Sequence, residues 1–329
     1  MTHLRLRAAL ALLAVIACLG VPQARAQSSY PAKPITMVVP FGAGGALDLV
    51  ARVLADGLRN ELGQPVIVDN RPGASGLIAM RYVANAAPDG YTIILSSESN
   101  HILLPLLDKS FPLDVAKDFV PVSLSGQFQH TLIVKKDSPV GTVQELTSYL
   151  RAHPGKMSFG SSGVGTQAHI AGEYLSLLTQ SKMVHVPYRS SPAALNDLLA
   201  GNLDINFQSM PAVRSYVDSP RLKMLAVLSA KRLDDLPNLP TMVESGFPDF
   251  QLSSWMGIFG PAGLPDDIRR KLADALVRVG RNPELQARVR GAGIEPVGSD
   301  AATFARFVDA EQKKWKTFIA RTGIKLNPS

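Results

Sequence analysis

The sequence has 329 residues, 46% of them hydrophobic, and a formal net charge of +7 at neutral pH. A single cysteine excludes a disulfide-stapled scaffold and a cysteine-ligated metal centre. The basic residues occur singly or in pairs such as Lys135-Lys136 and Arg269-Arg270, without the runs that follow a phosphate backbone. Nucleic acid is therefore not expected as a partner, and the charge indicates only a mild attraction for anions.

The first 26 residues have the order of a secretory signal peptide. Arg5 and Arg7 precede an apolar run from Ala8 to Val21, and Ala24-Arg25-Ala26 supplies small residues for cleavage after Ala26. The apolar run is shorter than the roughly 20 residues that span a bilayer. Removal of this leader takes away three arginines and lowers the formal charge from +7 to +4. We therefore expect a periplasmic protein with a soluble mature chain.

An alternative processing site lies inside the leader. Val15-Ile16-Ala17-Cys18 has the form of a lipoprotein cleavage box, which would leave a lipid-anchored Cys18. Because the apolar run continues past this cysteine and an Ala-x-Ala site follows, we favour cleavage after Ala26. The mature chain, about 300 residues long, exceeds what one compact core usually carries, so two lobes are expected.

From Ile35 onward, apolar β-rich runs alternate with amphipathic helical stretches, which indicates a parallel α/β sheet. The first series contains three predicted strands and one clear helix, whose apolar face is closed by Gly63. Its strands are expected at 35–39, 66–68 and 91–95, and its helix face at Leu47, Val50, Leu54 and Leu58.

A second series begins after the apolar run at 132–134. It predicts helices at 143–150, from near Thr166, and at 193–200 behind an N-cap at Ser191, with strands at 157–159 and 203–207. The C-terminal segment is helical, with one apolar face at 268–279 and a last helix begun by Ser299. Trp255 and Trp315 lie in this late part and are expected to serve packing.

Each series contains an apolar strand, a glycine-rich turn and then a helix. The turns are Phe41-Gly42-Ala43-Gly44-Gly45-Ala46-Leu47-Asp48 and Ser161-Ser162-Gly163-Val164-Gly165-Thr166. Glycine allows close approach of the backbone, and the free N–H groups of a helix start attract an anion without a lysine or arginine. Two such turns facing each other predict that both lobes bind one carboxylate. The alternative is that both are ordinary tight connections without a ligand.

Enzymatic sites fit these residues less well. The first turn lacks the Lys-Ser/Thr of a nucleotide-binding loop, and the second has His185 where a dinucleotide site needs an acid. No Gly-x-Ser-x-Gly or His-Glu-x-x-His motif occurs in the sequence. His169 and Glu173 could ligate a metal, but a helix-surface pair is favoured. Asp48 lies in the first turn of its helix, where the dipole favours a carboxylate, so capping explains it without a function. Beside the proposed anion site it could instead orient the loop amides or meet a ligand ammonium, and the sequence leaves both interpretations open.

At this point the chain resembles a known family, the periplasmic substrate-binding proteins of tripartite tricarboxylate transporters, also called the Bug family. The resemblance runs nearly end to end through separate blocks in order. They are 30–35, Phe41-x-x-Gly44-Gly45-x-x-Asp48, 68–74, 88–92, Gly160-Ser161-Ser162-Gly163-x-Gly165-Thr166-x-x-His169, 186–189, Leu239-Pro240-Thr241-Met242-Val243-Glu244-Ser245-Gly246 and 261–265.

The resemblance implies an α/β, two-lobed periplasmic-binding-protein fold of the Venus flytrap type II, with two hinge-crossing strands near 120–130 and 250–258. Residues 27–126 and 254–329 would form lobe 1, and residues 127–253 lobe 2. The ligand would be a small carboxylate, bound without a cofactor or metal, and the partners would be the membrane subunits of a tripartite transporter. A monomer is expected.

The resemblance also implies the residues of the site. Backbone groups of the two turns, partly through waters, would bind the carboxylate, and further segments would line the pocket. The ligand-binding set is Phe41, Gly42, Ala43, Gly44, Gly45, Ala46, Asp48, Gly73, Ala74, Ser75, Ser97, Asn100, Ser161, Ser162, Gly163, Gly165, Thr166, His169, Asn206 and Gln208.

The chain departs from the family pattern at position 47, where relatives often have Thr or Ser and this chain has Leu47. A hydroxyl contact is therefore lost, and Leu103 and Leu104 nearby also permit an apolar ligand. Two other functions stay open at this stage. One is a ligand sensor for a membrane receptor, which would use the same closed state. The other is a secreted hydrolase or isomerase using His169 and a serine, for which the sequence assembles no motif.

Overall fold

The computed structural model describes residues 30–325. The chain divides into two compact units, residues 1–32 and 33–329, and every helix and strand of the described residues belongs to the second. The predicted leader, its cleavage site after Ala26 and the alternative at Cys18 lie outside the described residues. Between residues 30 and 325, no helix combines the length and the apolar character needed to span a membrane.

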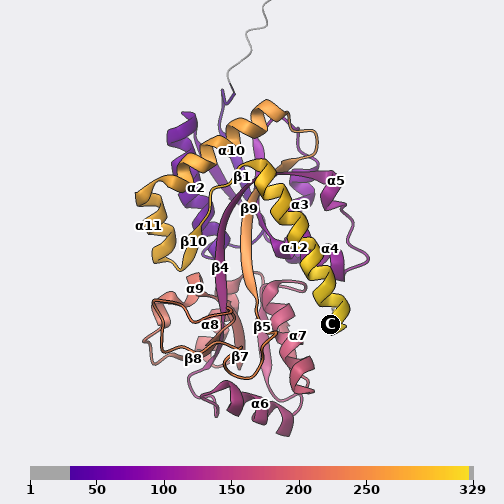
Figure 1. Ribbon diagram of the computed structural model, residues 1–329, viewed down its shortest axis with the longest axis vertical. Helices are drawn as coiled ribbons and strands as arrows, with labels where there is room; N and C mark the ends of the chain where they lie inside the picture. The colour runs from indigo at the N-terminus through magenta and orange to yellow at the C-terminus, as the bar shows by residue number, and fades with distance from the viewer. Residues whose placement is uncertain (1–29, 326–329) are drawn as a thin grey trace, which may run out of the picture. The chain divides into compact units, whose positions relative to one another are not determined.

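The unit is built on a ten-stranded mixed sheet with the order β2-β1-β3-β9-β4-β7-β5-β6, in which β8 and β10 also pair with β4. Figure 1 shows helices packed around each half of this sheet, with β4 and β9 running between the halves. The strands are β1 (Ile35–Val39), β2 (Val66–Asn70), β3 (Thr92–Ser97), β4 (Phe119–Lys135), β5 (Ser158–Ser161), β6 (Val184–Pro187), β7 (Ile205–Ser209), β8 (Leu222–Val227), β9 (Ser253–Pro261) and β10 (Ile294–Pro296).

The helices connect and cover these strands. The α-helices are α2 (Ala46–Leu62), α3 (Leu77–Ala84), α4 (Leu104–Leu107), α5 (Val115–Asp118), α6 (Val143–Ala152), α7 (Gln167–Thr179), α8 (Ser191–Ala200), α9 (Met210–Val213), α10 (Asp266–Arg281), α11 (Pro283–Gly291) and α12 (Ala301–Thr322). Three short turns complete the set: the 3₁₀ turns η1 (Ala74–Gly76) and η3 (Arg214–Tyr216) and the π-helical turn η2 (Ser99–Leu103).

The first lobe is the half built on β1, β2 and β3. Strand β1 pairs in parallel with both β2 and β3, and β9 runs antiparallel to β3. The neighbouring residues Met37 and Val38 of β1 point to opposite faces and are both fully buried, as expected for a strand covered by helices on both faces. The predicted helix face of α2, with Val50, is buried against this sheet. The carboxyl ends of β1 and β3 therefore lie side by side.

The second lobe is the half built on β5, β6, β7 and β8. Strand β5 pairs in parallel with β6 and β7, and both β7 and β8 run antiparallel to β4. Its core includes Phe159 and Phe207, which meet edge to face with ring centroids 6.5 Å apart. The carboxyl ends of β5 and β7 thus lie together, as those of β1 and β3 do in the first lobe.

Strand β4 changes partners along its length. Residues Phe119 to Gln129 pair with β9, whereas residues from His130 onward pair with β7 of the second lobe. Strand β9 begins at Ser253, opposite Gln129. The fold class predicted from the sequence is confirmed: two crossing strands join two α/β lobes. Strand β4 is longer than predicted, and β9 has the predicted length but begins three residues later.

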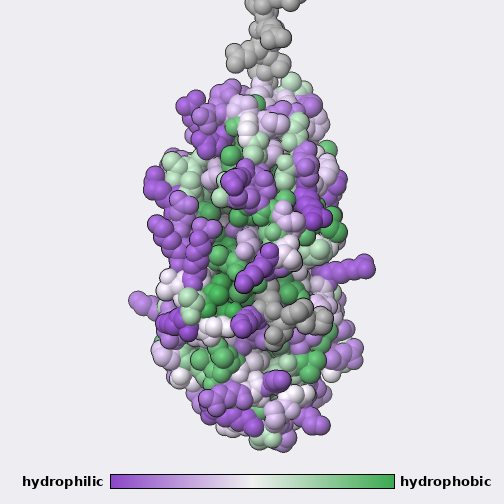
Figure 2. All heavy atoms as spheres, turned by 90° about the vertical axis from the view of Figure 1, so that its right-hand side faces the viewer, coloured by the Kyte–Doolittle hydropathy of each residue, from purple (hydrophilic) through white to green (hydrophobic). Residues whose placement is uncertain are grey.

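The C-terminal helices pack on the first lobe. A Cβ atom at Gly57 of α2 would lie 2.6 Å from Val279 of α10, so only glycine allows these helices to approach so closely. Arg278 of α10 forms an ion pair with Glu61 of α2 at 2.5 Å. On the face shown in Figure 2, hydrophobic residues gather about half-way down, and hydrophilic residues predominate above and below them.

Several local predictions need correction. Helix α8 is capped by Ser190, whose hydroxyl accepts the Ala193 N–H, and not by Ser191. Helix α12 is capped by Asp300 and not by Ser299, whose hydroxyl instead accepts the Leu124 N–H at 3.0 Å.

Both tryptophans are buried, with 2% of each side chain exposed, which confirms their packing role. Trp255 meets Phe304 and Phe307 edge to face. Trp315 meets Phe318 in the same way.

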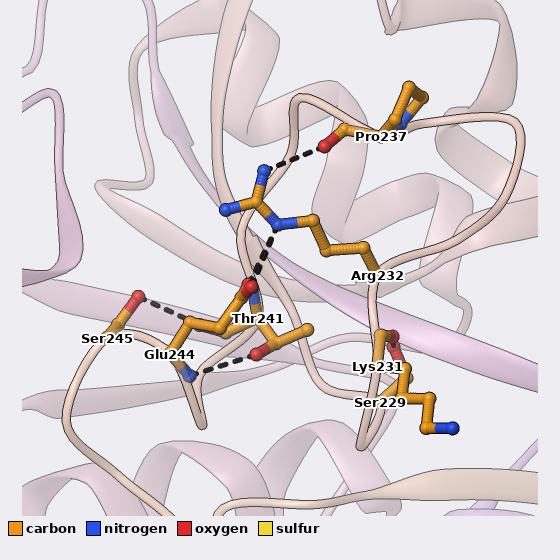
Figure 3. Close-up of polar contacts among 7 residues, drawn as sticks. All are labelled: Ser229, Lys231, Arg232, Pro237, Thr241, Glu244 and Ser245. Carbon is orange, nitrogen blue, oxygen red and sulfur yellow. Dashed lines mark hydrogen bonds and ion pairs between the residues drawn. The ribbon is translucent and has the colours of Figure 1, made fainter.

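The loop between β8 and β9 is held by a side-chain network (Figure 3). Thr241 and Glu244 form a reciprocal capping pair, with N–H to side-chain distances of 2.9 and 3.0 Å. Arg232 donates to both Glu244 carboxylate oxygens and to the Pro237 carbonyl. The block 239–246 that carries part of the family resemblance is thus explained here by loop structure, without a ligand.

Candidate ligand-binding site

A cavity lies between the lobes, where the carboxyl ends of the parallel strands meet the two crossing strands. Both lobes and both crossing strands contribute to its wall. The lining residues are Phe41, Gly42, Gly45, Ala46, Leu47, Asp48, Ser97, Ser99, Phe128, His130, Ser162, Thr166, Gln167, Ala168, Ser191, Phe207, Gln208, Ser209 and Ser254.

The first glycine-rich turn is held in place by its own neighbours. Asp48 accepts the Gly44 N–H at 3.0 Å and receives both Nε and Nη2 of Arg52, at 3.1 and 2.9 Å. Asn70 donates its side-chain amide to the Phe41 carbonyl at 3.0 Å. Burial opposes ionisation of Asp48, but hydrogen bonds from Arg52 and Gly44 outweigh it and hold its pKa below the ordinary value. Asp48 therefore holds the Gly44 amide of the turn in place, and its carboxylate is already paired with Arg52.

The second glycine-rich turn is likewise held by side chains of its own segment. Thr166 donates its hydroxyl to the Gly163 carbonyl at 2.7 Å, and the Gly163 N–H donates to Ser161 Oγ at 3.1 Å. The Gly165 N–H donates to Nδ1 of His169 at 3.1 Å. Because Nδ1 accepts this bond, the ring carries its proton on Nε2, toward Glu173.

His169 is buried and holds this turn in place through its hydrogen bond with Gly165. Only 1% of its side chain is exposed, and its Nε2 lies 3.6 Å from Glu173 Oε1. The prediction that His169 and Glu173 form a pair on the helix surface is therefore wrong, because His169 is buried. Within residues 30–325, no group of three His, Cys, Asp or Glu side chains is close enough together to hold a metal.

Helices α2 and α7 both begin at the cavity. Ala46, Leu47 and Asp48 start α2, and Gln167 and Ala168 start α7. The first N–H groups of an α-helix have no partner inside the helix and carry its positive dipole end. Neither helix is capped by the side chain of its own N-cap residue, whereas Thr142, Ser190, Asn282 and Asp300 cap helices α6, α8, α11 and α12. The first N–H of α7, from Gln167, donates to Ser99 Oγ of the first lobe. Two uncapped helix starts from different lobes thus face one cavity.

The lining side chains carry little charge. Asp48 and His130 are the only ionisable groups among the lining residues, and neither lysine nor arginine is present there. Burial lowers the pKa of His130 to about 4, so its ring is neutral at physiological pH. An anion in this cavity would therefore meet backbone dipoles, hydroxyl groups and a neutral imidazole.

The remaining wall is divided between apolar and hydroxyl-bearing residues. Phe41 and Leu47 come from the first turn, and Phe207 from the end of β7. Three lining residues carry buried polar atoms without a hydrogen-bond partner among the described residues, namely His130 Nδ1, Gln167 Oε1 and Ser209 Oγ. The Gln167 amide is oriented by its Nε2, which donates to the Ser253 carbonyl at 3.1 Å. Buried polar groups of this kind normally find a partner, so the wall is suited to a polar guest.

The lobes touch directly around the cavity. A Cβ atom at Gly42 would lie 3.2 Å from Ser190 Cβ, and one at Gly163 would lie 2.6 Å from Ser75 Oγ. The Gln167 N–H of α7 donates to Ser99 Oγ at 3.2 Å. The structure therefore describes the lobes in contact, with glycines at the points of closest approach.

The structure brings many of the predicted ligand-binding residues to this wall. Nine line the cavity: Phe41, Gly42, Gly45, Ala46, Asp48, Ser97, Ser162, Thr166 and Gln208. Four others line an adjoining groove at the seam between the lobes: Gly73, Ala74, Ser75 and Gly163.

The other predicted residues lie outside the lining. Ala43 and Gly44 are exposed. Ser161, His169 and Asn206 are buried, and Gly165 is tied to His169. Asn100 is buried and donates to the Ser75 carbonyl at 2.8 Å, which supports a loop with positive φ at Ala74 and Ser75.

Sequence reasoning missed part of the lining. Leu47 appeared only on the predicted helix face and as a departure from the family pattern. Nine further residues were not identified: Ser99, Phe128, His130, Gln167, Ala168, Ser191, Phe207, Ser209 and Ser254. Alternation along a crossing strand would have indicated Phe128 and His130 together, because residues two apart share one face of a strand.

The two lobes, the crossing strands and the cavity between the lobes define the class of protein: a solute-binding protein with the periplasmic-binding-protein fold. Residues 50–324 match the family described as "Tripartite tricarboxylate transporter family receptor". The chain belongs to this family, whose members include the Bug proteins.

Relatives and solved structures agree with this assignment. Protein BugT of Bordetella pertussis is 35% identical over 316 residues, which cover 94% of this chain and 96% of BugT. The structure of periplasmic binding protein BugD superposes with a TM-score of 0.85 at 33% identity, covering 90% of this chain and 99% of BugD.

Two similar structures contain carboxylates. Rpa4515 of R. palustris, described with adipate, has a TM-score of 0.85 at 33% identity and covers 90% of this chain and 99% of its own. MatC of Rhodopseudomonas palustris, described with bound malate, has a TM-score of 0.83 at 29% identity and covers 88% of this chain and 99% of its own.

Proposed function

We propose that this protein captures a small carboxylic acid between its lobes in the periplasm and delivers it to the membrane subunits of a tripartite transporter. One observation carries the proposal: the uncapped starts of α2 and α7 face one cavity from different lobes, and the lining contains no lysine or arginine. Backbone N–H groups and helix dipoles bind anions in such places. Adipate and malate in two similar structures support a carboxylate ligand.

In this proposal the ligand holds the lobes together. Its carboxylate meets the N–H groups of Ala46 and Leu47 from the first lobe and of Ala168 from the second. The lobes correspond to residues 27–126 with 254–329, and to residues 127–253. The predicted ligand-binding residues that lie behind the lining, such as Asn100 and His169, support the loops that carry these groups.

The processing and assembly proposed here follow from the sequence and the family. Cleavage after Ala26 would release a soluble monomer into the periplasm. No chemical step is assigned to the protein, because a binding protein needs only to close and reopen around an unchanged ligand.

A thermal-shift screen of organic acids tests the binding step. The mature chain is purified, unfolded and refolded to remove carried-over ligand, and then mixed with succinate, malate, adipate, citrate, benzoate or glutamate. A ligand at 100 times its dissociation constant adds about 2.7 kcal/mol to the free energy of unfolding, which raises the melting temperature by several degrees. Glucose and lysine serve as non-acidic controls. A chain that responds to none of the acids would contradict the proposal.

Delivery requires a separate measurement. Membrane vesicles containing the transporter's two membrane subunits should accumulate the labelled acid when the loaded protein is present on the outer side. Uptake that is equal without the protein would contradict the delivery step and leave the binding step intact.

A further inference from the structure

A buried carboxyl group lies directly behind the cavity, where the two crossing strands meet. Glu98 follows the last residue of β3 and has no exposed surface. The Trp255 N–H of β9 donates to its Oε2 at 2.7 Å, and Ser254 Oγ lies 3.1 Å from its Oε1. Ser254 Oγ also lies 2.7 Å from Nε2 of His130 on β4. Because Ser254 and His130 line the cavity, hydrogen bonds connect this carboxyl group to the ligand site.

The groups around Glu98 do not supply a balancing positive charge. Glu311 and Lys314 of α12 act on it in opposite directions and are paired with each other at 3.0 Å. From β4, His130 is neutral because burial lowers its pKa to about 4. On the turn that follows Glu98, burial lowers the pKa of His101 to about 3. From β9, only the uncharged Ser254 and Trp255 contact the carboxyl group. Burial therefore dominates and raises the pKa of Glu98 to about 8.

An anion in the cavity would be a further negative charge, connected to Glu98 through His130 and Ser254. Closure of the lobes removes water from Ser254 and His130, and two like charges in a dry site disfavour each other. Anion binding therefore disfavours the ionised form of Glu98, and protonation of Glu98 favours anion binding to the same extent. Resting on the carboxylate-binding function proposed above, we propose that the protein takes up one proton together with its anion and that Glu98 receives this proton.

The hydrogen-bond chain can follow this change without moving its heavy atoms. When Glu98 is protonated, its O–H donates to Ser254, and the Ser254 O–H donates to Nε2 of His130. When Glu98 is ionised, Ser254 donates to the carboxylate and His130 donates from Nε2 to Ser254. The proton on Glu98 therefore reverses the direction of the chain. In the protonated form His130 carries its hydrogen on Nδ1, which has no hydrogen-bond partner among the described residues.

The direction of the pH effect follows from this coupling. The pKa of Glu98 is higher in the closed, loaded state than in the open state. The affinity is therefore highest below the open-state pKa and falls by up to about tenfold per pH unit above it, until the loaded-state pKa is reached. In Glu98→Gln, the side chain is neutral at every pH, its carbonyl can accept the Trp255 N–H, and its NH₂ can donate to Ser254. This variant should retain the low-pH affinity throughout.

Titration calorimetry tests the coupling. The acid that gives the largest shift in the panel above is titrated between about pH 6 and 9, in pairs of buffers that differ in ionisation enthalpy, so that proton uptake is counted directly. We expect wild-type uptake to rise toward one proton per ligand and Glu98→Gln to show none. Glu284→Gln, which neutralises an exposed carboxylate on α11 that does not act on Glu98, should behave like the wild type.

The possible outcomes separate the two proposals. Binding without proton uptake over the whole range, or unchanged uptake in Glu98→Gln, overturns the role of Glu98 and leaves the carboxylate-binding function standing. If Glu98→Gln fails to fold, the number of protons that the wild type takes up per bound ligand decides whether binding is coupled to protonation. Absence of binding by every acid overturns the proposed function and this inference with it.

Discussion

The backbone N–H of Gln167, the first residue of α7, donates to the hydroxyl of Ser99 across the lobe interface at 3.2 Å. The Gln167 side chain donates to the Ser253 carbonyl, where β9 begins. The start of a second-lobe helix is thus attached to the first lobe and to a crossing strand. The hydrogen bond to Ser99 can form only when the lobes are in contact. It therefore stabilises the closed state and not the open state.

Replacing Ser99 by alanine should weaken ligand binding selectively. The variant leaves the Gln167 N–H without its acceptor in the closed state, which costs about 1 kcal/mol and lowers the affinity about fivefold. The melting temperature of the unliganded protein should change little, because the open lobes do not make this bond. Ser110→Ala is the control, since Ser110 bonds only to the neighbouring Asp108. Equal affinities in wild type and Ser99→Ala would contradict a role for this bond in closure.

Gly163→Ala should block closure. Gly163 has a φ of +124°, and a Cβ atom there would lie 2.6 Å from Ser75 Oγ of the first lobe. Gly201→Ala provides a matched control, because Gly201 has a φ of +84° with no atom within 4 Å of the added Cβ. Both variants should lose about 1 kcal/mol or more of stability from backbone strain. Only Gly163→Ala should lose at least tenfold in affinity by calorimetry, and a similar loss in Gly201→Ala would assign the effect to strain alone.

Arg52→Gln should weaken the binding of anionic ligands. Arg52 pairs with the carboxylate of Asp48, which lies at the start of α2 beside the cavity. Without Arg52, the uncompensated negative charge should reduce the affinity several-fold, with a smaller effect as salt is added. Arg59→Gln on the same helix is the control. An effect that does not depend on salt would point to a disturbed turn.

Leu47→Ser should change which acid is preferred. Leu47 lines the cavity, at the position where the family resemblance implies a hydroxyl side chain. Removal of its buried apolar surface should cost about 1–2 kcal/mol with an apolar-bodied acid such as adipate. The new hydroxyl should offset part of this loss with malate, so the malate-to-adipate affinity ratio should rise several-fold. Leu47→Met should keep the wild-type ratio, and an unchanged ratio in Leu47→Ser would remove this position from the ligand contacts.

Two buried histidines should make the protein sensitive to acid. Burial lowers the pKa of His101 to about 3 and that of His130 to about 4, whereas each takes up a proton near its ordinary value when the chain unfolds. The unfolded state binds more protons below about pH 6.5, so the free energy of unfolding should fall by roughly 1 kcal/mol per pH unit for each histidine. Urea unfolding between pH 4 and 8 measures this slope. His101→Phe should reduce it, whereas His153→Phe, which replaces an exposed ring, should not.

Much of the fold could be predicted because the signals are local. The apolar run 35–39, the helical face that ends at Gly63 and the turn around Gly163 correspond directly to observed elements. Strand β8 was not predicted, because its pairing with β4 joins residues far apart in the sequence. Local periodicity contains no information on such a partner.

The ligand site, like the fold, could be predicted only where its residues carry a local sequence signal. The two glycine-rich turns carry a sequence signature, whereas His130 and Ser254 reach the cavity only through the pairing of β4 with β7 and of β9 with β4. The purpose of the glycines also differed in part from the prediction. Gly42 and Gly163 allow the opposite lobe to approach, a requirement that depends on tertiary structure.

The path of the chain along β4 and β9 has a consequence for maturation. The second lobe lies between these strands in the sequence, so its polypeptide is continuous, whereas the first lobe needs partners from both ends of the chain. Ile94 pairs with Phe259, and Phe128 with Ile294. Since contacts between distant segments form late, we expect the inserted lobe to become ordered first and the outer lobe to follow only after the last third of the polypeptide has emerged. Ligand affinity, which needs both, would then be the final property that a newly exported molecule acquires.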